Sequence, residues 1–300
     1  MALDVRDYLD PVAAARLGHL ELVARTLVEG FIKGLHFSAA KGSSIEFAAH
    51  RPYVPGDEIR HIDWKTFARS DRFFLKEYED ETNVRAALVV DTSGSMGFGS
   101  GELPKFRYAC CLAAALGYLL LGQRDAVGLV LAGSGIERYV PPKSTPQHLR
   151  GIFAALEAAH PRGETNLAGC LDKLAERLPR RSFAIVLSDC IDDPRAVLRS
   201  IAHLRHRHSE VILFHILDPA EEEFPFTGWT VFRDVENPAV RVRLDARQVR
   251  EIYRENLASH LEILRKGCAA AGVDYSLMST KKPFELSLAT YLDARERRER

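Results

Sequence analysis

Residues 91–100 read DTSGSMGFGS and follow the apolar run AALVV at 86–90. Asp91, Ser93 and Ser95 stand two positions apart, so in an extended turn their side chains point to one side of the backbone. One carboxylate and two hydroxyls are hard oxygen ligands of the kind that Mg²⁺ accepts. The spacing therefore predicts a metal-binding turn at the end of a buried strand, although hydrogen bonds to turn amides would also explain these residues.

Other chemistries of a serine-rich turn fit this stretch less well. A serine nucleophile needs the GxSxG elbow and a histidine base, but the residue two positions before Ser95 is Ser93 rather than glycine. The phosphate-binding string GxxxxGK[ST] is absent, and Gly97, Gly99 and Gly101 form GxGxG instead of the dinucleotide-binding GxGxxG. The sequence therefore favours neither a serine hydrolase nor a nucleotide-binding protein.

The turn follows one of several apolar runs, which we expect to be strands and which alternate with expected helices. Proline at the first helical position and a capping residue before it mark helices at Thr145-Pro146 and Asp193-Pro194, and a further helix can begin at Thr165. Such alternation predicts the α/β class with a doubly wound, mostly parallel sheet. The expected strands are 84–91, 125–133, 182–189, 210–218 and 273–280.

The same sheet brings two more polar side chains toward the turn. Asp189 ends the apolar strand in AIVLSDC, and Thr165 in RGETNLAGC lies in a loop that leads into a helix. Because the carboxyl ends of parallel strands meet at one edge, we expect Asp91 and Asp189 to converge there, with Thr165 in an adjacent loop. Each residue alone is also a natural helix cap, so the prediction of a divalent cation site depends on the joint set of two carboxylates and three hydroxyls.

The first part of the chain has a different pattern. Apolar residues at helical spacing from Pro11 to about Lys33 predict an amphipathic helix. Residues 34–81 hold two strand-like stretches around a charged and aromatic segment. We therefore predict a small N-terminal α+β layer with its helix over 1–82, and a larger domain over 83–300 that closes with a hairpin, a helix over 246–272, the last strand and a helix from about 284.

The composition of the chain limits which classes of partner and which cellular compartment we expect. Lys+Arg and Asp+Glu both number 41, and this balance gives no reason to expect nucleic acid or an anionic membrane as a partner. The five cysteines lack CxxC spacing and mostly lie in apolar runs, which predicts free, buried thiols in a reducing compartment. The polar N-terminus predicts no signal peptide, and the apolar run 110–122 is shorter than the ~20 residues of a membrane span. We therefore expect a cytoplasmic protein in which that run is a buried helix.

The motifs DTSGSM after a buried strand, GETNL downstream and VLSD at a later strand end together resemble the metal-ion-dependent adhesion site of von Willebrand factor A-type domains. This resemblance covers residues from about 84 to 218. More specifically, GLHFSAAKGSSIEF and RPYVPGDEIRHIDWKTFAR, with DTSGSM shortly after them, resemble the bacterial domain of unknown function 58 family.

The resemblance implies a binding site rather than a catalytic one, so we do not expect an enzyme. The ion is Mg²⁺, or Mn²⁺ or Ca²⁺ in its place, and an acidic residue of a protein partner completes its shell. Members of the bacterial family are commonly associated with MoxR-type AAA+ ATPases, which implies an adaptor or co-chaperone. The rival hypotheses are a metal-dependent hydrolase or phosphatase that uses the same carboxylates, and a scaffold with a vestigial site. By position, the implied site residues are Asp91, Ser93, Ser95, Thr165 and Asp189.

A second family-like block lies between Arg51 and Arg69. We interpret it as an internal charge network with Trp64 in the core, in preference to a partner surface. No reaction is assigned to it. Its members are Tyr53, Pro55, Gly56, Asp57, Arg60, Asp63, Trp64 and Lys65.

Overall fold

The computed structural model describes residues 19–35, 47–52, 66, 73–78, 84–207, 209–237 and 239–299. It divides into two compact units, one formed by residues up to Ile32 and from Val84 onward, the other by residues between Lys33 and Asn83. In the smaller unit, β1 (Phe47–Pro52) and β2 (Phe74–Tyr78) pair antiparallel. Residues 11–18 of the predicted first helix, and every named member of the block between Arg51 and Arg69, lie outside the described residues.

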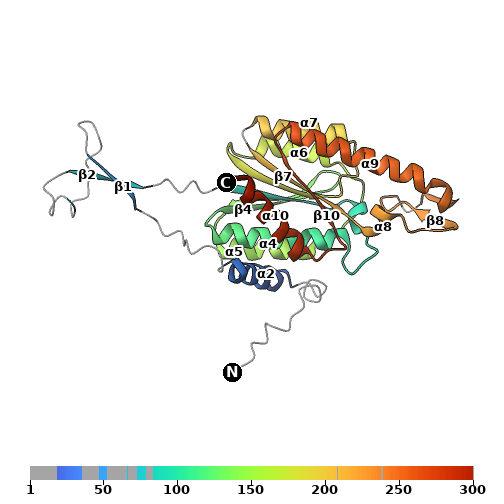
Figure 1. Ribbon diagram of the computed structural model, residues 1–300, viewed down its shortest axis with the longest axis horizontal. Coiled ribbons are helices and arrows are strands. Elements are labelled where there is room, and N and C mark those ends of the chain that lie inside the picture. The colour runs from blue at the N-terminus through green and yellow to red at the C-terminus, as the bar shows by residue number, and fades with distance from the viewer. Residues whose placement is uncertain are drawn as a thin grey trace, which may run out of the picture. The chain divides into compact units, whose positions relative to one another are not determined.

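A sheet of six strands forms the centre of the larger unit (Figure 1). The strands stand in the order β10-β7-β6-β3-β4-β5, and neighbours are parallel except for β4 and β5. This arrangement confirms the predicted α/β class with a doubly wound, mostly parallel sheet. The strands are β3 (Arg85–Asp91), β4 (Ala126–Ala132), β5 (Ile136–Lys143), β6 (Ser182–Ser188), β7 (Glu210–Leu217) and β10 (Asp274–Ser279).

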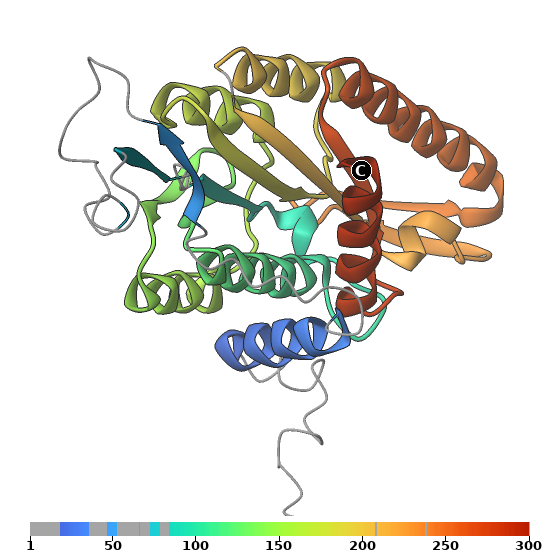
Figure 2. The same ribbon diagram turned by 60° about the vertical axis from the view of Figure 1, so that its left-hand side comes forward.

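Helices cover both faces of this sheet (Figures 1 and 2). One face carries α4, α5 and α10, with α2 on their outer side, and the other carries α6, α7 and α9. A hydrophobic core lies on each face of the sheet, and alternate residues of a strand point into one core or the other. Leu88 of β3 belongs to the core beneath α4, and Val89 belongs to the core beneath α6. The helices are α2 (Leu20–Leu35), α4 (Lys105–Gly122), α5 (Pro146–Ala158), α6 (Leu167–Arg177), α7 (Pro194–His206), α8 (Pro219–Glu223), α9 (Ala246–Ala270) and α10 (Phe284–Glu299).

Helix α4 contains the longest apolar run of the sequence and is buried over most of its length. Among the described residues it is the one helix whose length and composition would suffice to cross a membrane. It packs beneath the sheet and between other helices, as the prediction of a buried helix over residues 110–122 requires. All five cysteines are free and buried, which confirms the prediction of free, buried thiols.

The N-terminal helix packs into the larger unit instead of the small layer with which the sequence analysis grouped it. Leu20, Val23 and Leu27 of α2 join the same core as α4 and α5. The backbone N–H of Leu20 also donates to Glu157 Oε1 of α5 at 2.9 Å, which satisfies one free amide at the start of the helix. The helix α2 is amphipathic, and its apolar face packs against the large domain, which explains this difference.

The apolar strands of the sheet lie within one or two residues of their predicted positions. Strand β5 was not predicted, because none of its residues is fully buried and it contains Pro141 and Pro142. Prolines are tolerated there because β5 is an edge strand. After residue 218 the structure has the expected hairpin, formed by β8 (Trp229–Arg233) and β9 (Arg241–Asp245).

Candidate metal centre

The predicted carboxylates lie where the order of the strands reverses. From β3 the chain continues to β4 on one side, whereas β6 lies on the other side of β3. In open α/β sheets, ligands bind outside the carboxyl ends of the strands at such a switch point. Asp91 is the last residue of β3, and Asp189 directly follows β6. The fold therefore places both carboxylates at the position where this type of sheet most often binds a ligand.

The turn after β3 gathers three polar side chains. Asp91 Oδ1 accepts a hydrogen bond from the Ser93 N–H at 2.9 Å, and the 3₁₀-helix η3 (Gly94–Gly97) continues the turn. The hydroxyl oxygens of Ser93 and Ser95 are 3.1 Å apart, and both residues are buried. Neighbouring oxygens around Mg²⁺ are separated by about 3 Å, since each lies about 2.1 Å from the ion. The two hydroxyls thus have the mutual distance of oxygens that share one cation.

Asp91 is held by hydrogen bonds alone. Its Oδ2 accepts a hydrogen bond from the hydroxyl of Ser188 at 2.5 Å, and its side chain is nearly inaccessible to solvent. Within the described part of the chain, no ion pair to Asp91 compensates its charge. Burial raises the pKa of Asp91 to about 6, and the nearby carboxylate of Asp189 adds to the rise. The ionised form of Asp91 therefore lacks a positive partner.

Asp189 is instead paired with a buried lysine. Lys105, in the first turn of α4, has its Nζ 2.8 Å from Asp189 Oδ2 and 2.5 Å from Glu221 Oε1. Burial disfavours the charge of Lys105, but the two carboxylates outweigh burial and hold its pKa above the ordinary value. Glu221 also accepts from the Asp218 N–H at 2.9 Å in the capping box of α8. The ion pair is therefore anchored to the backbone as well.

Together these side chains carry more negative than positive charge. When Asp91, Asp189 and Glu221 are ionised and Lys105 is protonated, the cluster has a formal charge of minus two. Uncompensated buried charge is unfavourable, and a divalent cation would neutralise it. No group of three or more His, Cys, Asp or Glu among the described residues is placed to hold a metal ion. A cation would therefore depend on hydroxyls as much as on carboxylates, and this oxygen-only set fits Mg²⁺.

Thr165 borders the turn but does not cap the helix that follows it. Asn166 is the N-cap of α6, and its side chain accepts from the Gly169 N–H at 3.1 Å. The Thr165 loop is joined to η3 by a hydrogen bond of 2.9 Å from the Gly94 N–H to the Gly163 carbonyl. In the described structure no hydrogen bond links Thr165 to the other predicted site residues. Thr165 is thus adjacent to the buried set, and the cap role proposed as its alternative belongs to Asn166.

Four side chains at this edge escaped the sequence analysis: Lys105, Ser188, Glu221 and Glu236. A signal was present for Lys105, because a lysine in the first turn of an apolar helix opposes the helix dipole and needs a compensating anion. Ser188 also stands directly before Asp189 at the end of a buried strand. Glu221 and Glu236 lie in later segments and have no local pattern that indicates the site.

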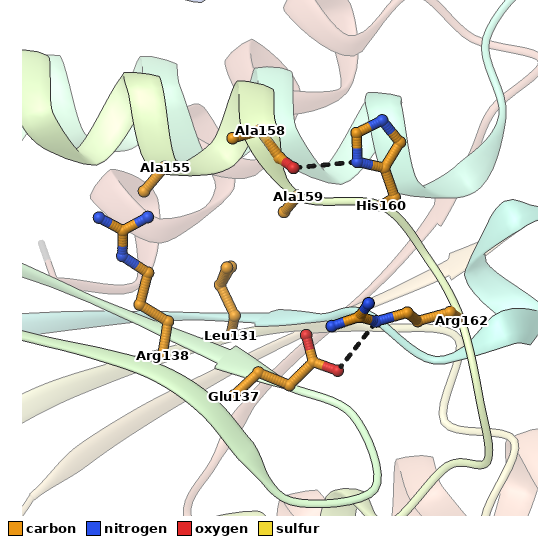
Figure 3. A pocket seen from close by; sticks show the side chains of 8 residues that line it. All are labelled: Leu131, Glu137, Arg138, Ala155, Ala158, Ala159, His160 and Arg162. Carbon is orange, nitrogen blue, oxygen red and sulfur yellow. Dashed lines mark hydrogen bonds and ion pairs between the residues drawn. The ribbon is translucent and has the colours of Figure 1, made fainter.

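A pocket of about 240 Å³ is lined by residues of β4, β5 and α5 and of the segment that follows α5 (Figure 3). Arg162 lines it and pairs with Glu137 at 3.7 Å, while the Arg162 N–H donates to the Thr92 carbonyl at 2.8 Å. None of the five predicted site residues lines this pocket, and its remaining lining is largely alanine, leucine and exposed polar groups. It is therefore separate from the candidate centre.

Comparisons with known proteins place the chain in a family. The uncharacterized protein Rv1480 of Mycobacterium tuberculosis (strain ATCC 25618 / H37Rv) is 29% identical over 296 residues, which cover 97% of this chain and 92% of that protein. The uncharacterized protein YeaD of Bacillus subtilis (strain 168) is 28% identical over 114 residues, 38% of this chain and 26% of that protein. A solved aerotolerance-related membrane protein from Bacteroides fragilis is 15% identical with a TM-score of 0.48, over 70% of this chain and 99% of that chain. Residues 49–263 match the family described as protein of unknown function DUF58, and the chain belongs to this family.

Proposed function

We propose that this chain is a Mg²⁺-dependent protein-binding module with a metal-ion-dependent adhesion site of the von Willebrand factor A type. One observation carries the proposal: Asp91 is buried among hydroxyls at the switch point, beside a second carboxylate, with no cation paired to it in the described structure. When bound, the ion supplies positive charge and an open position for an acidic side chain of a partner. Its ligands would be Asp91, Ser93, Ser95, Thr165 and Asp189.

The surrounding residues have supporting roles in this proposal. Ser188 orients the Asp91 carboxylate, and Lys105 fixes Asp189, so that neither carboxylate needs to reorganise when a cation arrives. Burial of the turn excludes bulk water and strengthens electrostatic interactions at the site. Binding alone accounts for these features, and we therefore propose an adhesion module in preference to an enzyme.

The resemblance to the bacterial family further supports a MoxR-type AAA+ ATPase as the partner, with this chain as its adaptor or co-chaperone. The free, buried thiols fit a reducing compartment such as the cytoplasm, where we propose that the pair works. The partner would contribute a surface carboxylate, because a hard cation with one free coordination position prefers an oxygen ligand such as a carboxylate.

Calorimetric titration with Mg²⁺ tests the metal site. The wild type should bind one ion per chain, and Asp91→Asn should abolish binding because it removes a charged ligand while it preserves the shape of the side chain. Asp293→Asn, an exposed change on α10, should bind as the wild type does. Equal binding by both variants would exclude Asp91 as a ligand and contradict the proposal.

Capture of a purified MoxR-type ATPase tests the partner. Both proteins are kept in the same Mg²⁺ buffer without nucleotide, so that the ATPase's own metal requirement is constant, and only the bait changes between wild type, Asp91→Asn and Asp293→Asn. Capture by the wild type and the control, with loss in Asp91→Asn, is expected. Capture that is independent of Asp91 would show that the contact does not use the metal site.

A further inference from the structure

The tip of the β8–β9 hairpin lies against the candidate metal centre. Glu236 Oε1 accepts from the Thr165 hydroxyl at 2.5 Å, and Glu236 Oε2 accepts from the Thr165 N–H at 3.3 Å. A Cβ atom on Gly94, which stands between the two site serines, would meet the Val235 carbonyl oxygen at 2.8 Å and the Glu236 Cα at 3.2 Å. The hairpin therefore touches the metal-binding turn and the Thr165 loop at once.

The tip is shaped so that the Glu236 carboxylate is presented to Thr165. Asp234 Oδ1 accepts from the N–H groups of Glu236 at 2.8 Å and Asn237 at 3.2 Å, and the Asp234 N–H donates to the Val240 carbonyl at 3.1 Å. These bonds fix the turn at the end of the two strands. The position of Glu236 is thus determined by the backbone of the hairpin and not by its side chain alone.

Apart from its tip, the described part of the hairpin packs on the domain through one face. Phe232 of β8 packs on Phe224 and Phe226, with ring centroids 5.8 and 5.3 Å apart. The opposite face is open, because Trp229 and Val231 are 71% and 60% exposed. The strands pair only with each other and do not extend the central sheet. Displacement of the tip would therefore leave both cores of the sheet intact.

We propose that Glu236 is the chain's own acid for the metal centre, in the place that a partner's carboxylate would take, so that partner and hairpin compete for one position. This inference rests on the proposed function. The Thr165 hydroxyl, one of the proposed ligands, donates a hydrogen bond to the Glu236 carboxylate, so an ion bound by Thr165 would have this carboxylate beside it. Thr165 and Glu236 are partly exposed, whereas Asp91 and Ser93 are buried, so the hairpin covers the side from which a partner must approach.

If Glu236 and a partner compete for one position at the ion, a partner must bind strongly enough to displace Glu236. An acid tethered on a short hairpin acts at an effective concentration in the millimolar range or above. A single free carboxylate cannot displace it at lower concentration, whereas a protein that also contacts the open face of the hairpin can. The self-bound state thus selects a protein that makes further contacts with the hairpin over small acids.

Titration with Mn²⁺, followed by the relaxation rate of water protons, tests the role of Glu236. Mn²⁺ replaces Mg²⁺ as the probe, and the relaxation rate reports how many exchanging water molecules the bound ion keeps. Relative to wild type, Glu236→Gln should bind Mn²⁺ at least about tenfold more weakly, as expected when one carboxylate near the ion is lost, and should hold more exchanging water. Millimolar acetate should then displace water in Glu236→Gln but not in the wild type.

Matched variants separate the failure of this inference from the failure of the proposed function. Glu251→Gln, an exposed change on α9, should behave as the wild type in every measurement. If Asp91→Asn abolishes Mn²⁺ binding while Glu236→Gln leaves affinity and relaxation unchanged, Glu236 has no place at the ion and only this inference is overturned. If the wild type does not bind Mn²⁺, both the inference and the proposed function are wrong.

Discussion

Two carboxylates lie at the ends of adjacent parallel strands, yet their surroundings differ. Asp189, after β6, has its charge balanced by the buried ammonium of Lys105, which also binds Glu221. Asp91, at the end of β3, accepts hydrogen bonds from two neutral donors, the Ser93 amide and the Ser188 hydroxyl, and from no charged group among the described residues. Among the described residues, the chain thus supplies a cation to Asp189 and none to Asp91.

This difference separates a structural ion pair from the carboxylate that we propose as a metal ligand. The ion pair of Lys105 needs nothing from solution and ties α4 to β6 and α8. The hydroxyl-lined carboxylate keeps a charge that only a group from outside the described structure can neutralise. Removal of charge should therefore lower the free energy of unfolding at the ion pair of Lys105 but not at Asp91, and added metal should stabilise the protein only when Asp91 is present.

Lys105→Met should give the largest effect. Loss of one partner from a buried ion pair typically lowers the free energy of unfolding by about 3–5 kcal/mol, because the remaining carboxylates stay buried without compensation. Denaturant unfolding measures this loss. Lys173→Met, an exposed change on α6, is the control and should stay within about 0.5 kcal/mol of wild type. A stable Lys105→Met variant would mean that the ion pair has no structural role.

Asp91→Asn should leave the metal-free protein at least as stable as wild type, because it removes an uncompensated buried charge. In the wild type, Mg²⁺ at a hundredfold excess over its dissociation constant should raise the free energy of unfolding by about 2.7 kcal/mol. Thermal unfolding with and without Mg²⁺ should show this gain in the wild type and none in the variant. A large destabilisation of metal-free Asp91→Asn would show that the Asp91 carboxylate, like the ion pair of Lys105, stabilises the fold.

Ser188→Ala should weaken Mg²⁺ binding by about 10- to 100-fold, the range for loss of a residue that orients a metal ligand. The matched control is Ser182→Ala, since Ser182 is also buried but lies at the opposite end of β6 and donates to the Pro179 carbonyl. Calorimetry on both variants compares the two ends of one strand. Equal losses would point to a general effect on the strand.

Asn166→Ala and Thr165→Ala should separate two adjacent residues with different tasks. Asn166→Ala should lower stability by about 1 kcal/mol through loss of the α6 cap, with no change in Mg²⁺ affinity. Thr165→Ala should reduce Mg²⁺ affinity with little change in stability. Urea denaturation and Mg²⁺ titration of both variants test this assignment, and an exchange of the two effects would show that it is wrong.

The sheet could be predicted because buried parallel strands are continuous apolar runs, and the helices between them carry caps such as Asp193. Strand β5 could not, since an exposed edge strand with adjacent prolines lacks both apolar continuity and regular alternation. The position of α2 also escaped prediction. Its amphipathic pattern indicates that one face is buried, but a periodic pattern does not say which surface covers that face.

Within the candidate centre, the sequence indicated the residues whose spacing or strand position is local. Asp91, Ser93 and Ser95 lie in one short motif, and Asp189 ends a recognisable strand. The ion pair of Lys105 joins side chains from three elements, and contacts at such separations leave no local pattern. Thr165 was considered as a possible cap and Asn166, which is the cap in the structure, was not, although both residue types cap helices well.

The hydrogen bond between Ser188 and Asp91 spans 97 positions of the chain and crosses from β6 to β3. Parallel pairing over such a separation forms late and slowly in folding, because a long loop must close first. A nascent or truncated chain that ends before β6 lacks Ser188 and Asp189, and with them the hydrogen bond that holds Asp91 Oδ2. If the proposed cation site exists, binding of the cation would then require that β3 and β6 have already paired.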